Sequence, residues 1–347
     1  MKTILRPFTF LFLPCLLALS AGCSSNNSPT STNPNDWEEV TAHAAFAGRY
    51  GLAGTVFNGQ MWVVGGASGS GAVTTYYSDV WTSGDGASWS KTNGGAPFGG
   101  RYGSQVLSFG GKLWLIGGNQ SGALKNDVWN STDGAAWTQV LPAGPASATQ
   151  FSAREDFQAL VFNGLMWVIG GWSGQNNGDV WSSPDGITWT KVFAGGGVGG
   201  FAGRWGLTSA ILNNQIWIFG GASGLTGDTD PTQGYGDAWF SPTGAVWTKA
   251  TQYAGYGLLY FHQTVNKGGQ LWMTAGFLWN NWGGQSQVAT SGDGINWTGA
   301  LGSFPRRFFH LSLVYNNYVW IIAGADDYCD TTTVCPVQYL NDVWRHQ

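Results

Sequence analysis

Short apolar segments recur along the chain about every 50 residues, and each contains a Trp and ends in two small residues. The six copies occupy 61–66, 113–118, 166–171, 216–221, 271–276 and 319–324. Successive tryptophans in these copies are 52, 53, 50, 55 and 48 residues apart. Runs this short, rich in β-branched and aromatic residues and bounded by glycines, predict buried β-strands. The period therefore indicates an all-β fold assembled from six copies of one unit.

Each copy predicts four short antiparallel strands, named here A to D in chain order. Strand A ends at a hairpin turn such as Asn58-Gly59, a dipeptide favoured in type I′ turns, and strand B is the Trp-containing segment. Strand C begins with Asp-Val-Trp or Asp-Ala-Trp in five of the six copies. Strand D follows a tight turn and begins at Trp89, Trp137, Trp189, Trp247 or Trp297.

The two ends of the repeat array complement each other. The sixth copy stops after strand C, at Gln347, whereas an extra segment at 36–40, containing Trp37, precedes the first copy. We predict that this segment supplies the missing strand D and closes a ring, because an open array would leave exposed sheet edges. The sequence thus predicts a six-bladed β-propeller of four-stranded antiparallel blades over residues 36–347.

The repeat spacing, the Gly pair after strand B and the two later aromatic residues resemble kelch repeats across residues 36–347. Kelch blades usually carry Tyr where this chain has the Trp of Asp-Val-Trp, so the resemblance is to a divergent branch. The turn at 83–89 is also similar to the Asp box of sialidase propellers, with one residue fewer between Asp and Trp. The kelch resemblance implies that an Arg before each innermost strand lies near the central channel, where some family members hold acidic ligands.

Composition narrows the classes of protein and partner. Charged residues make up 10% of the chain, against roughly 25% in ordinary soluble domains, which excludes a coiled coil or a charged disordered chain. The net charge of −4 excludes the basic surface of a nucleic-acid-binding protein. Seventeen of the 21 Trp occupy repeat positions, so we expect them in the core and do not count them as evidence for sugar binding.

The N-terminal segment predicts export. Lys2 and Arg6 precede a short apolar run at 8–19, which is typical of a secretory signal. The stretch 19–23 resembles the lipobox of bacterial lipoproteins, with Ser20 where Leu is usual, and this implies acylation of Cys23. Cleavage by an ordinary signal peptidase is the alternative.

These features divide the chain into a signal peptide at 1–22, a flexible tether at 23–35 and the propeller at 36–347. We expect a bacterial cell-envelope protein on the outer-membrane, periplasmic or cell-surface side, attached to the membrane only through its lipid. Cys329 and Cys335, with five residues between them in an exported chain, predict a local disulfide.

Five arginines lie 13 residues before a strand-B Trp, at Arg49, Arg101, Arg154, Arg204 and Arg307. Their planar guanidinium groups suit acidic ligands, which makes Arg101, Arg154 and Arg204 candidate binding residues. The fifth copy replaces the Arg with Leu259 and the strand-C Asp with Gln287. This joint loss favours the other interpretation, in which Arg and Asp pair with each other.

Strand direction places the D–A and B–C connections on one face, together with the long loops 67–77, 222–236, 277–286 and 325–340. We expect binding residues there. The candidates are Trp172, Trp205, Trp279, Trp282, Asn280, Asn281 and Tyr256, which could stack on a sugar ring and hydrogen-bond its hydroxyls. The alternative is that these side chains pack the loops against one another.

Glu155, His262 and His310 are weak candidates for catalysis. For the two histidines, burial with satisfied hydrogen bonds is the favoured interpretation. We expect no cofactor and no metal, because the Asp-rich stretches at 228–237 and 326–330 match no EF-hand spacing.

The sequence therefore favours a monomeric, non-catalytic binding module for a glycan or protein ligand. The alternative is an enzyme acting on an acidic carbohydrate at the channel mouth, similar to a sialidase or a sialic acid mutarotase. Arg–Asp pairs in the blades would favour the binding module, whereas convergence of Glu155, His262 and unpaired arginines would favour the enzyme.

Overall fold

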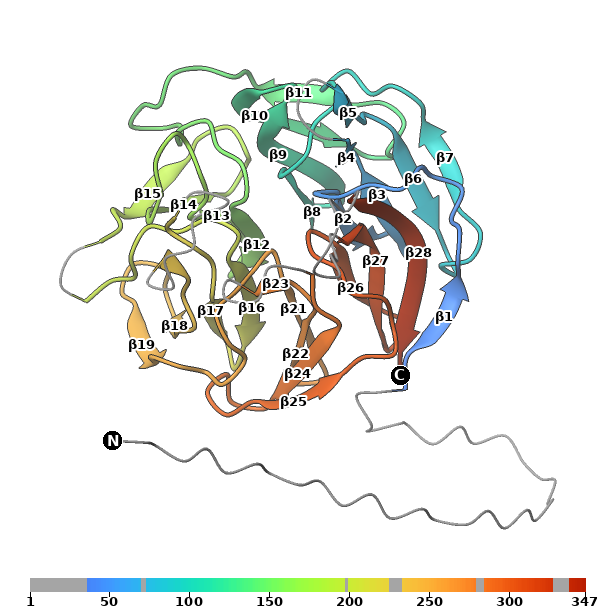
Figure 1. Ribbon diagram of the computed structural model, residues 1–347. Coiled ribbons are helices and arrows are strands. Elements are labelled where there is room, and N and C mark those ends of the chain that lie inside the picture. The colour runs from blue at the N-terminus through green and yellow to red at the C-terminus, as the bar shows by residue number, and fades with distance from the viewer. Residues whose placement is uncertain (1–35, 70–72, 197–198, 225–232, 279–283, 327–336) are drawn as a thin grey trace, which may run out of the picture. The chain divides into compact units, whose positions relative to one another are not determined.

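The computed structural model of the protein describes residues 36–69, 73–196, 199–224, 233–278, 284–326 and 337–347. The chain divides into two units, Met1–Thr30 and Ser31–Gln347, and the first lies outside the described residues. The second unit is a six-bladed β-propeller, with four-stranded antiparallel blades arranged in a ring (Figure 1). The predicted fold is confirmed. Within the described part of the chain, no helix has the length and apolar character needed to cross a membrane.

The strands follow chain order within each of the first five blades, from the innermost to the outermost. Blade 1 contains β2 (Ala53–Phe57), β3 (Gln60–Val64), β6 (Val80–Ser83) and β7 (Ser90–Asn93). Blade 2 contains β8 (Gln105–Phe109), β9 (Lys112–Gln120), β10 (Ala123–Ser131) and β11 (Thr138–Leu141). Blade 3 contains β12 (Gln158–Phe162), β13 (Leu165–Ile169), β14 (Val180–Ser183) and β15 (Thr190–Phe193).

The remaining blades repeat this arrangement. Blade 4 contains β16 (Thr208–Leu212), β17 (Gln215–Phe219), β18 (Ala238–Ser241) and β19 (Thr248–Thr251). Blade 5 contains β21 (Gln263–Lys267), β22 (Gln270–Thr274), β24 (Gln287–Ser291) and β25 (Thr298–Leu301). Blade 6 contains β26 (Leu311–Tyr315), β27 (Tyr318–Asp326), β28 (Gln338–His346) and β1 (Glu38–Thr41). Two short pairs, β4 (Ala67–Ser68) with β5 (Thr75–Tyr76) and β20 (Leu259–Tyr260) with β23 (Phe277–Leu278), extend blades 1 and 5.

The N-terminal strand closes the ring as the sequence predicts. Strand β1 pairs antiparallel with β28, with Glu38 opposite Arg345, and the Arg345 Nε lies 2.8 Å from a Glu38 carboxylate oxygen. Just before β1, the buried Trp37 ring packs edge-on against Phe304, at a centroid distance of 5.0 Å. The first and last described parts of the chain therefore share one blade.

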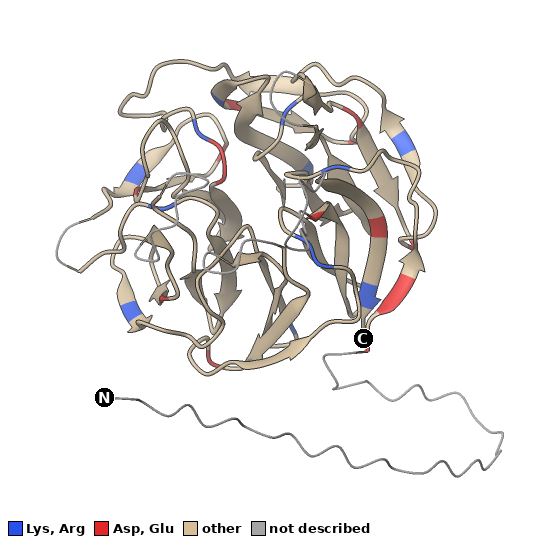
Figure 2. Ribbon diagram, viewed as in Figure 1, with Lys and Arg blue, Asp and Glu red and all other residues tan. Residues whose placement is uncertain are grey.

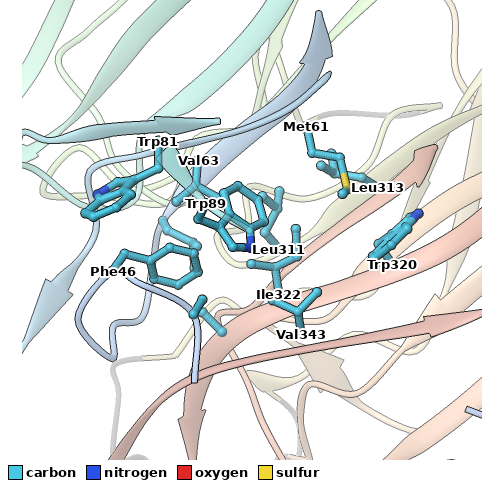
Figure 3. Close-up of a cluster of buried hydrophobic side chains, with 13 residues drawn as sticks. Phe46, Met61, Val63, Trp81, Trp89, Leu311, Leu313, Trp320, Ile322 and Val343 are labelled. Carbon is cyan, nitrogen blue, oxygen red and sulfur yellow. The ribbon is translucent and has the colours of Figure 1, made fainter. Parts of the chain in front are cut away.

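Apolar side chains fill the spaces between neighbouring blades. Figure 3 shows the cluster between blades 1 and 6, in which Met61 and Val63 of β3 pack with Leu311 and Leu313 of β26 and with Trp320 of β27. Clusters of the same kind occur between the other blades. The strand-B tryptophans are 2–6% exposed, which confirms that they belong to the core.

Five of the six strand-B tryptophans are also covered by a glycine from the C–D turn of the next blade. The pairs are Trp62 with Gly134, Trp114 with Gly186, Trp167 with Gly244, Trp217 with Gly294, and Trp320 with Gly86. These glycines have φ of 73–76°, and a Cβ at any of them would overlap the indole ring. Blade 6 ends at β28 without such a turn, and His346 instead packs on Trp272 at a centroid distance of 4.8 Å.

Candidate functional site

A closed ring of six backbone hydrogen bonds surrounds the central axis. Its members, from blade 1 to blade 6, are Gly51, Gly103, Asp156, Gly206, Phe261 and Phe309. Each amide donates to the carbonyl of the ring residue in the preceding blade over 2.8–3.1 Å, and Gly51 donates to Phe309 to complete the circle. All six residues have φ between 54° and 62°, the left-handed region that favours glycine.

The residue before each ring member forms a second, wider circle on the face with the long loops. These six residues are Tyr50, Tyr102, Glu155, Trp205, Tyr260 and Phe308. Each is fixed by an antiparallel β-bridge to a residue just after the Gly pair of its own blade, as in Glu155 with Trp172. Five are aromatic, and the sixth is the only Glu in the chain beyond β1.

These two circles enclose a pocket of about 340 Å³ at the axis. Its lining residues are Tyr50, Tyr102, Glu155, Asp156, Trp172, Trp205, Gly224, Phe261, Phe308 and Phe309. Trp205 packs on Phe261 at a centroid distance of 5.1 Å, and its indole N–H donates to the Gly224 carbonyl over 2.9 Å. The pocket is thus a rigid aromatic cup with two neighbouring carboxyl groups on one side.

Glu155 is buried, Asp156 is half-buried, and both carboxyl groups are incompletely hydrogen-bonded. Glu155 is 9% exposed, and its Oε2 has no hydrogen-bond partner among the described residues; the same holds for Oδ1 of Asp156. Burial raises the pKa of Glu155, although hydrogen bonds from the side chains of Tyr102 and Asn119 oppose this rise. Burial, and then the charge of Glu155, raise the pKa of Asp156 well above its usual range.

Burial and nearby charges also shift the pKa values of the two tyrosines that line the pocket, Tyr50 and Tyr102. Burial, followed by the charges of neighbouring groups including Asp156 and Glu155, raises the pKa of Tyr50 to about 12. Burial and the charges of Glu155 and Asp156 raise the pKa of Tyr102 as well. Both phenols therefore remain neutral hydrogen-bond donors at the pocket wall near neutral pH.

The five arginines form bidentate ion pairs with the strand-C Asp of their own blade. The pairs are Arg49–Asp79, Arg101–Asp127, Arg154–Asp179, Arg204–Asp237 and Arg307–Asp342, with closest N–O distances of 2.5–2.8 Å. Each Arg also donates to the carbonyl of the first small residue after strand B, and each Asp accepts from the indole N–H of the strand-C Trp.

These arginines are 0–1% exposed, and none is among the described residues that line the pocket. Arg101, Arg154 and Arg204, which the sequence also offered as ligand-binding residues, are therefore committed to structural pairs. In blade 5, where the pair is absent, the buried Leu259 joins an apolar cluster instead. The pairing hypothesis drawn from Leu259 and Gln287 agrees with this geometry.

The loop-face candidates fall into three groups. Trp172 and Trp205 both line the pocket. The prediction for Tyr256 is wrong: it is 2% exposed, packs in the core beside Trp297, and donates its hydroxyl to the Asp237 carbonyl over 2.9 Å. The other candidates, Trp279, Asn280, Asn281 and Trp282, lie outside the described residues, as do Cys23, Cys329 and Cys335.

The two histidines lie on the other side of the backbone ring from Glu155. They border a chamber of about 40 Å³ that also touches Asp156. His310 Nε2 lies 2.9 Å from the Thr274 hydroxyl, whereas neither ring nitrogen of His262 has a hydrogen-bond partner among the described residues. Burial lowers the pKa of His262 to about 3 and also lowers that of His310. Burial is confirmed for both, but the expected hydrogen bonding is not found for His262.

The sequence pointed to Trp172, Trp205 and Glu155 singly, but not to the other aromatic residues of the pocket, which are Tyr50, Tyr102, Phe261, Phe308 and Phe309. A signal was present in the repeat register. The residue after each Arg, or after Leu259 in blade 5, is aromatic in five copies and Glu in the sixth. Comparing the copies at fixed offsets from the Arg would have revealed this circle.

Within the described ranges, no group of three or more His, Cys, Asp or Glu side chains is arranged to hold a metal ion. Of the Asp residues considered for Ca²⁺, Asp237 is paired with Arg204. A scan against protein-family models gave no match, and a search of curated proteins found no similar sequence.

Proposed function

We propose that this protein is a non-catalytic binding module that holds a small ligand, or one group of a larger glycan, in the axial pocket. The pocket volume of about 340 Å³ falls within the range of small-molecule sites, which is roughly 300–1,000 Å³. Its lining also has the usual composition of such sites, since aromatic walls provide contact area and a few polar groups give orientation.

The observation that carries this proposal is backbone strain in the six-residue ring, whose non-Gly members line the pocket. Three blades place Gly at the ring position, but the other three place Asp156, Phe261 and Phe309 there at φ of 54–56°. A bulky residue in this region is a genuine outlier and costs roughly 1–3 kcal/mol. All three residues line the pocket, so the strained backbone conformation occurs where the side chain can contribute to ligand binding.

The arrangement of charges favours this function over an enzyme that acts on an acidic carbohydrate. Such an enzyme needs a cation facing the substrate, but the five arginines are paired with Asp within their blades. The pocket instead offers the carboxyl groups of Glu155 and Asp156 and no cationic side chain among its described lining residues, so it has no group that would attract an anionic sugar.

The cellular setting is part of the proposal. The signal-like segment at 1–22 and the lipobox-like stretch before Cys23 support an exported protein that is attached to the bacterial cell envelope by lipid. The repeat pattern further supports placement of the propeller in a divergent kelch-like group. The pocket would then be presented outside the cytoplasm to a ligand in the envelope or the medium.

The first test is a thermal-shift screen of the mature protein against neutral and acidic saccharides. A ligand at about a hundred times its dissociation constant stabilises the fold by roughly 2.7 kcal/mol, which shifts the melting temperature measurably. Trp172→Ala should abolish the shift, because this half-buried ring lines the pocket. Tyr253→Ala, which truncates an aromatic residue that is 73% exposed and outside the pocket lining, should leave the shift intact.

Equal shifts in the wild type and Trp172→Ala would place the ligand elsewhere and contradict the pocket. Absence of any shift across the screen would overturn small-ligand binding and transfer the function to a protein partner on the same face.

A further inference from the structure

Two carboxyl oxygens at the pocket have no hydrogen-bond partner among the described residues, and this indicates the kind of group that would bind there. Glu155 is nine-tenths buried in the wall, yet its Oε2 has no hydrogen-bond partner among the described residues, and Oδ1 of Asp156 is likewise unpartnered. Leaving a buried polar acceptor unpaired costs about 1–3 kcal/mol, and more for a charged group. Both oxygens are covered by protein, so a bound group would compensate them through its positive charge rather than by a direct hydrogen bond.

The aromatic residues that line the pocket are suited to a positively charged group. Tyr50, Tyr102, Trp172, Trp205 and Phe308 present ring surfaces around the same cavity. Aromatic faces carry negative electrostatic potential, and cages of such rings bind ammonium groups by cation–π attraction. Carboxyl groups on one side of an aromatic cage add direct charge complementarity to this attraction.

No basic side chain among the described lining residues competes for that position. Among the described residues lining the pocket, none is Lys, Arg or His. Basic positions lie on the outermost strands β7, β15 and β19 (Figure 2). They are Lys91, Lys191 and Lys249, and each Nζ lies 4.9–5.0 Å from the centroid of the strand-C Trp ring of the same blade. The four long loops at 67–77, 222–236, 277–286 and 325–340 contain five Asp and no Lys, Arg or His in sequence.

The position of the acids within the repeat is also selective. At the position just before the backbone ring, five blades carry an aromatic residue and blade 3 carries Glu155. In the ring itself, blade 3 carries Asp156, with φ of 56°. The Asp156 carboxyl lies against Gly103 of blade 2, where a Cβ would meet its Oδ1 at 2.7 Å. Two adjacent departures from the repeat thus create one acidic spot in an otherwise aromatic cup.

From the orphaned carboxyl oxygens and the surrounding rings, we infer that the ligand group held in the pocket is an organic ammonium ion. The ammonium group lies against Glu155 and Asp156, and its carbon substituents contact the aromatic walls. This inference rests on the proposed binding function and specifies the chemical class of its ligand.

Proton release provides a signature of this mode of binding. Burial raises the pKa of both carboxyls, so the pair in the empty pocket keeps its protons to a higher pH than exposed carboxyls do. A bound cation favours the ionised carboxylates and lowers these pKa values. Affinity for a cation of fixed charge should therefore increase with pH above the ordinary carboxyl range. The titratable groups facing the pair are Tyr50 and Tyr102 in the pocket and His262 and His310 in the chamber on the other side of Asp156. The raised pKa values of the tyrosines and the lowered pKa values of the histidines keep all four neutral in this window.

The test is calorimetric titration of the mature protein with choline and with 3,3-dimethylbutan-1-ol, its neutral carbon analogue of the same shape. Choline should bind about ten-fold or more tightly than the alcohol, the ratio expected of a desolvated cation–π and carboxylate site. Binding of choline, but not of the alcohol, should release protons, seen as different heats in buffers of different ionisation enthalpy. Glucosamine against N-acetylglucosamine repeats the comparison and shows whether the ammonium group is carried by a sugar.

Glu155→Gln is the diagnostic variant, and Glu39→Gln is its matched control, since Glu39 is exposed on β1 and the net charge change is identical. Glu155→Gln should weaken choline binding about ten-fold and leave binding of the alcohol unchanged, whereas Glu39→Gln should change neither. Equal affinity for charged and neutral partners, or choline binding insensitive to Glu155→Gln, would overturn the ammonium inference.

The failures of the two proposals are distinguishable. If neutral sugars bind in a manner that depends on Trp172 but choline and glucosamine do not, the binding module stands and the ammonium inference falls. If no member of these pairs and no saccharide binds, both fall.

Discussion

At the scale of the residue, the ring position has the same backbone conformation in all six blades but different side chains. Gly51, Gly103 and Gly206 adopt it without strain, whereas Asp156 and the two phenylalanines do not. The backbone hydrogen bonds are retained in every blade, so the side chains are not needed for the ring itself. Their contribution is to the pocket.

The ionisation of Asp156 gives a prediction with a definite sign. Burial raises its pKa above the ordinary 3.8, so the folded protein holds this proton more tightly than the unfolded chain. The resulting stability is complete at pH below 3.8 and is lost as pH rises through the raised value. Asp156→Asn cannot ionise. Its free energy of unfolding relative to the wild type should therefore increase between pH 4 and pH 8, by at most about 1.4 kcal/mol per pH unit.

Denaturant unfolding at several pH values checks this prediction. Asp133→Asn is the opposing control, because hydrogen bonds from backbone amides, first that of Ala136, lower the pKa of Asp133. Its effect should shrink as the pH falls. A constant difference between Asp156→Asn and the wild type would show that the carboxyl does not titrate with folding in this range. The neighbouring titratable groups are Glu155, Tyr50, Tyr102, His262 and His310.

At the scale of the element, blade 5 shows how the ion pair of the other blades can be replaced. Leu259 and Gln287 occupy the Arg and Asp positions, and Leu259 is buried among apolar residues. Breaking a buried pair by removing one partner leaves an uncompensated charge and costs about 3–5 kcal/mol, whereas replacing both partners is far less damaging. Blade 5 has changed both.

Blade 2 can be converted to the blade 5 arrangement as a test. Arg101→Leu should reduce the free energy of unfolding by about 3–5 kcal/mol, because Asp127 remains buried without its partner. Adding Asp127→Gln should restore at least half of the loss. Arg345→Leu, which removes a more exposed partner of Glu38, should cost less than about 1 kcal/mol. A double variant no more stable than Arg101→Leu would refute the replacement argument.

At the scale of the whole molecule, stability depends on closure of the ring by the N-terminal strand. Strand β1 covers the edge of β28, and Trp37 fills a space beside Phe304 and His346. Removing both would expose an unpaired sheet edge and an apolar surface.

Deletion of residues 36–41 should therefore lower the melting temperature of the entire propeller and promote aggregation. Deletion of 24–35, a longer segment, serves as the control and should leave the melting temperature unchanged. Thermal unfolding followed by tryptophan fluorescence reports on all blades, because each contains buried indoles. Similar losses from the two deletions would contradict closure through β1.

The amino-acid sequence alone was enough to predict the blade number, the four strands per blade and the closing strand. It also favoured pairing of the arginines with Asp, but only the structure showed that each pair lies within one blade. These features repeat, and each copy independently reports the same local pattern of apolar residues, turns and charges. Even the exception was informative, because Leu259 and Gln287 changed together. Periodic information of this kind survives without knowledge of the three-dimensional structure.

Only the tertiary structure decided the pocket. Its residues lie about 50 positions apart, one or two per blade, and they become neighbours only when the ring closes around its axis. For the same reason Tyr256 looked like a loop residue in sequence but is buried against the core, and Glu155 gained its significance from Tyr102 in the adjacent blade. Repetition specifies the scaffold, whereas departures from repetition acquire a function only where closure brings them together.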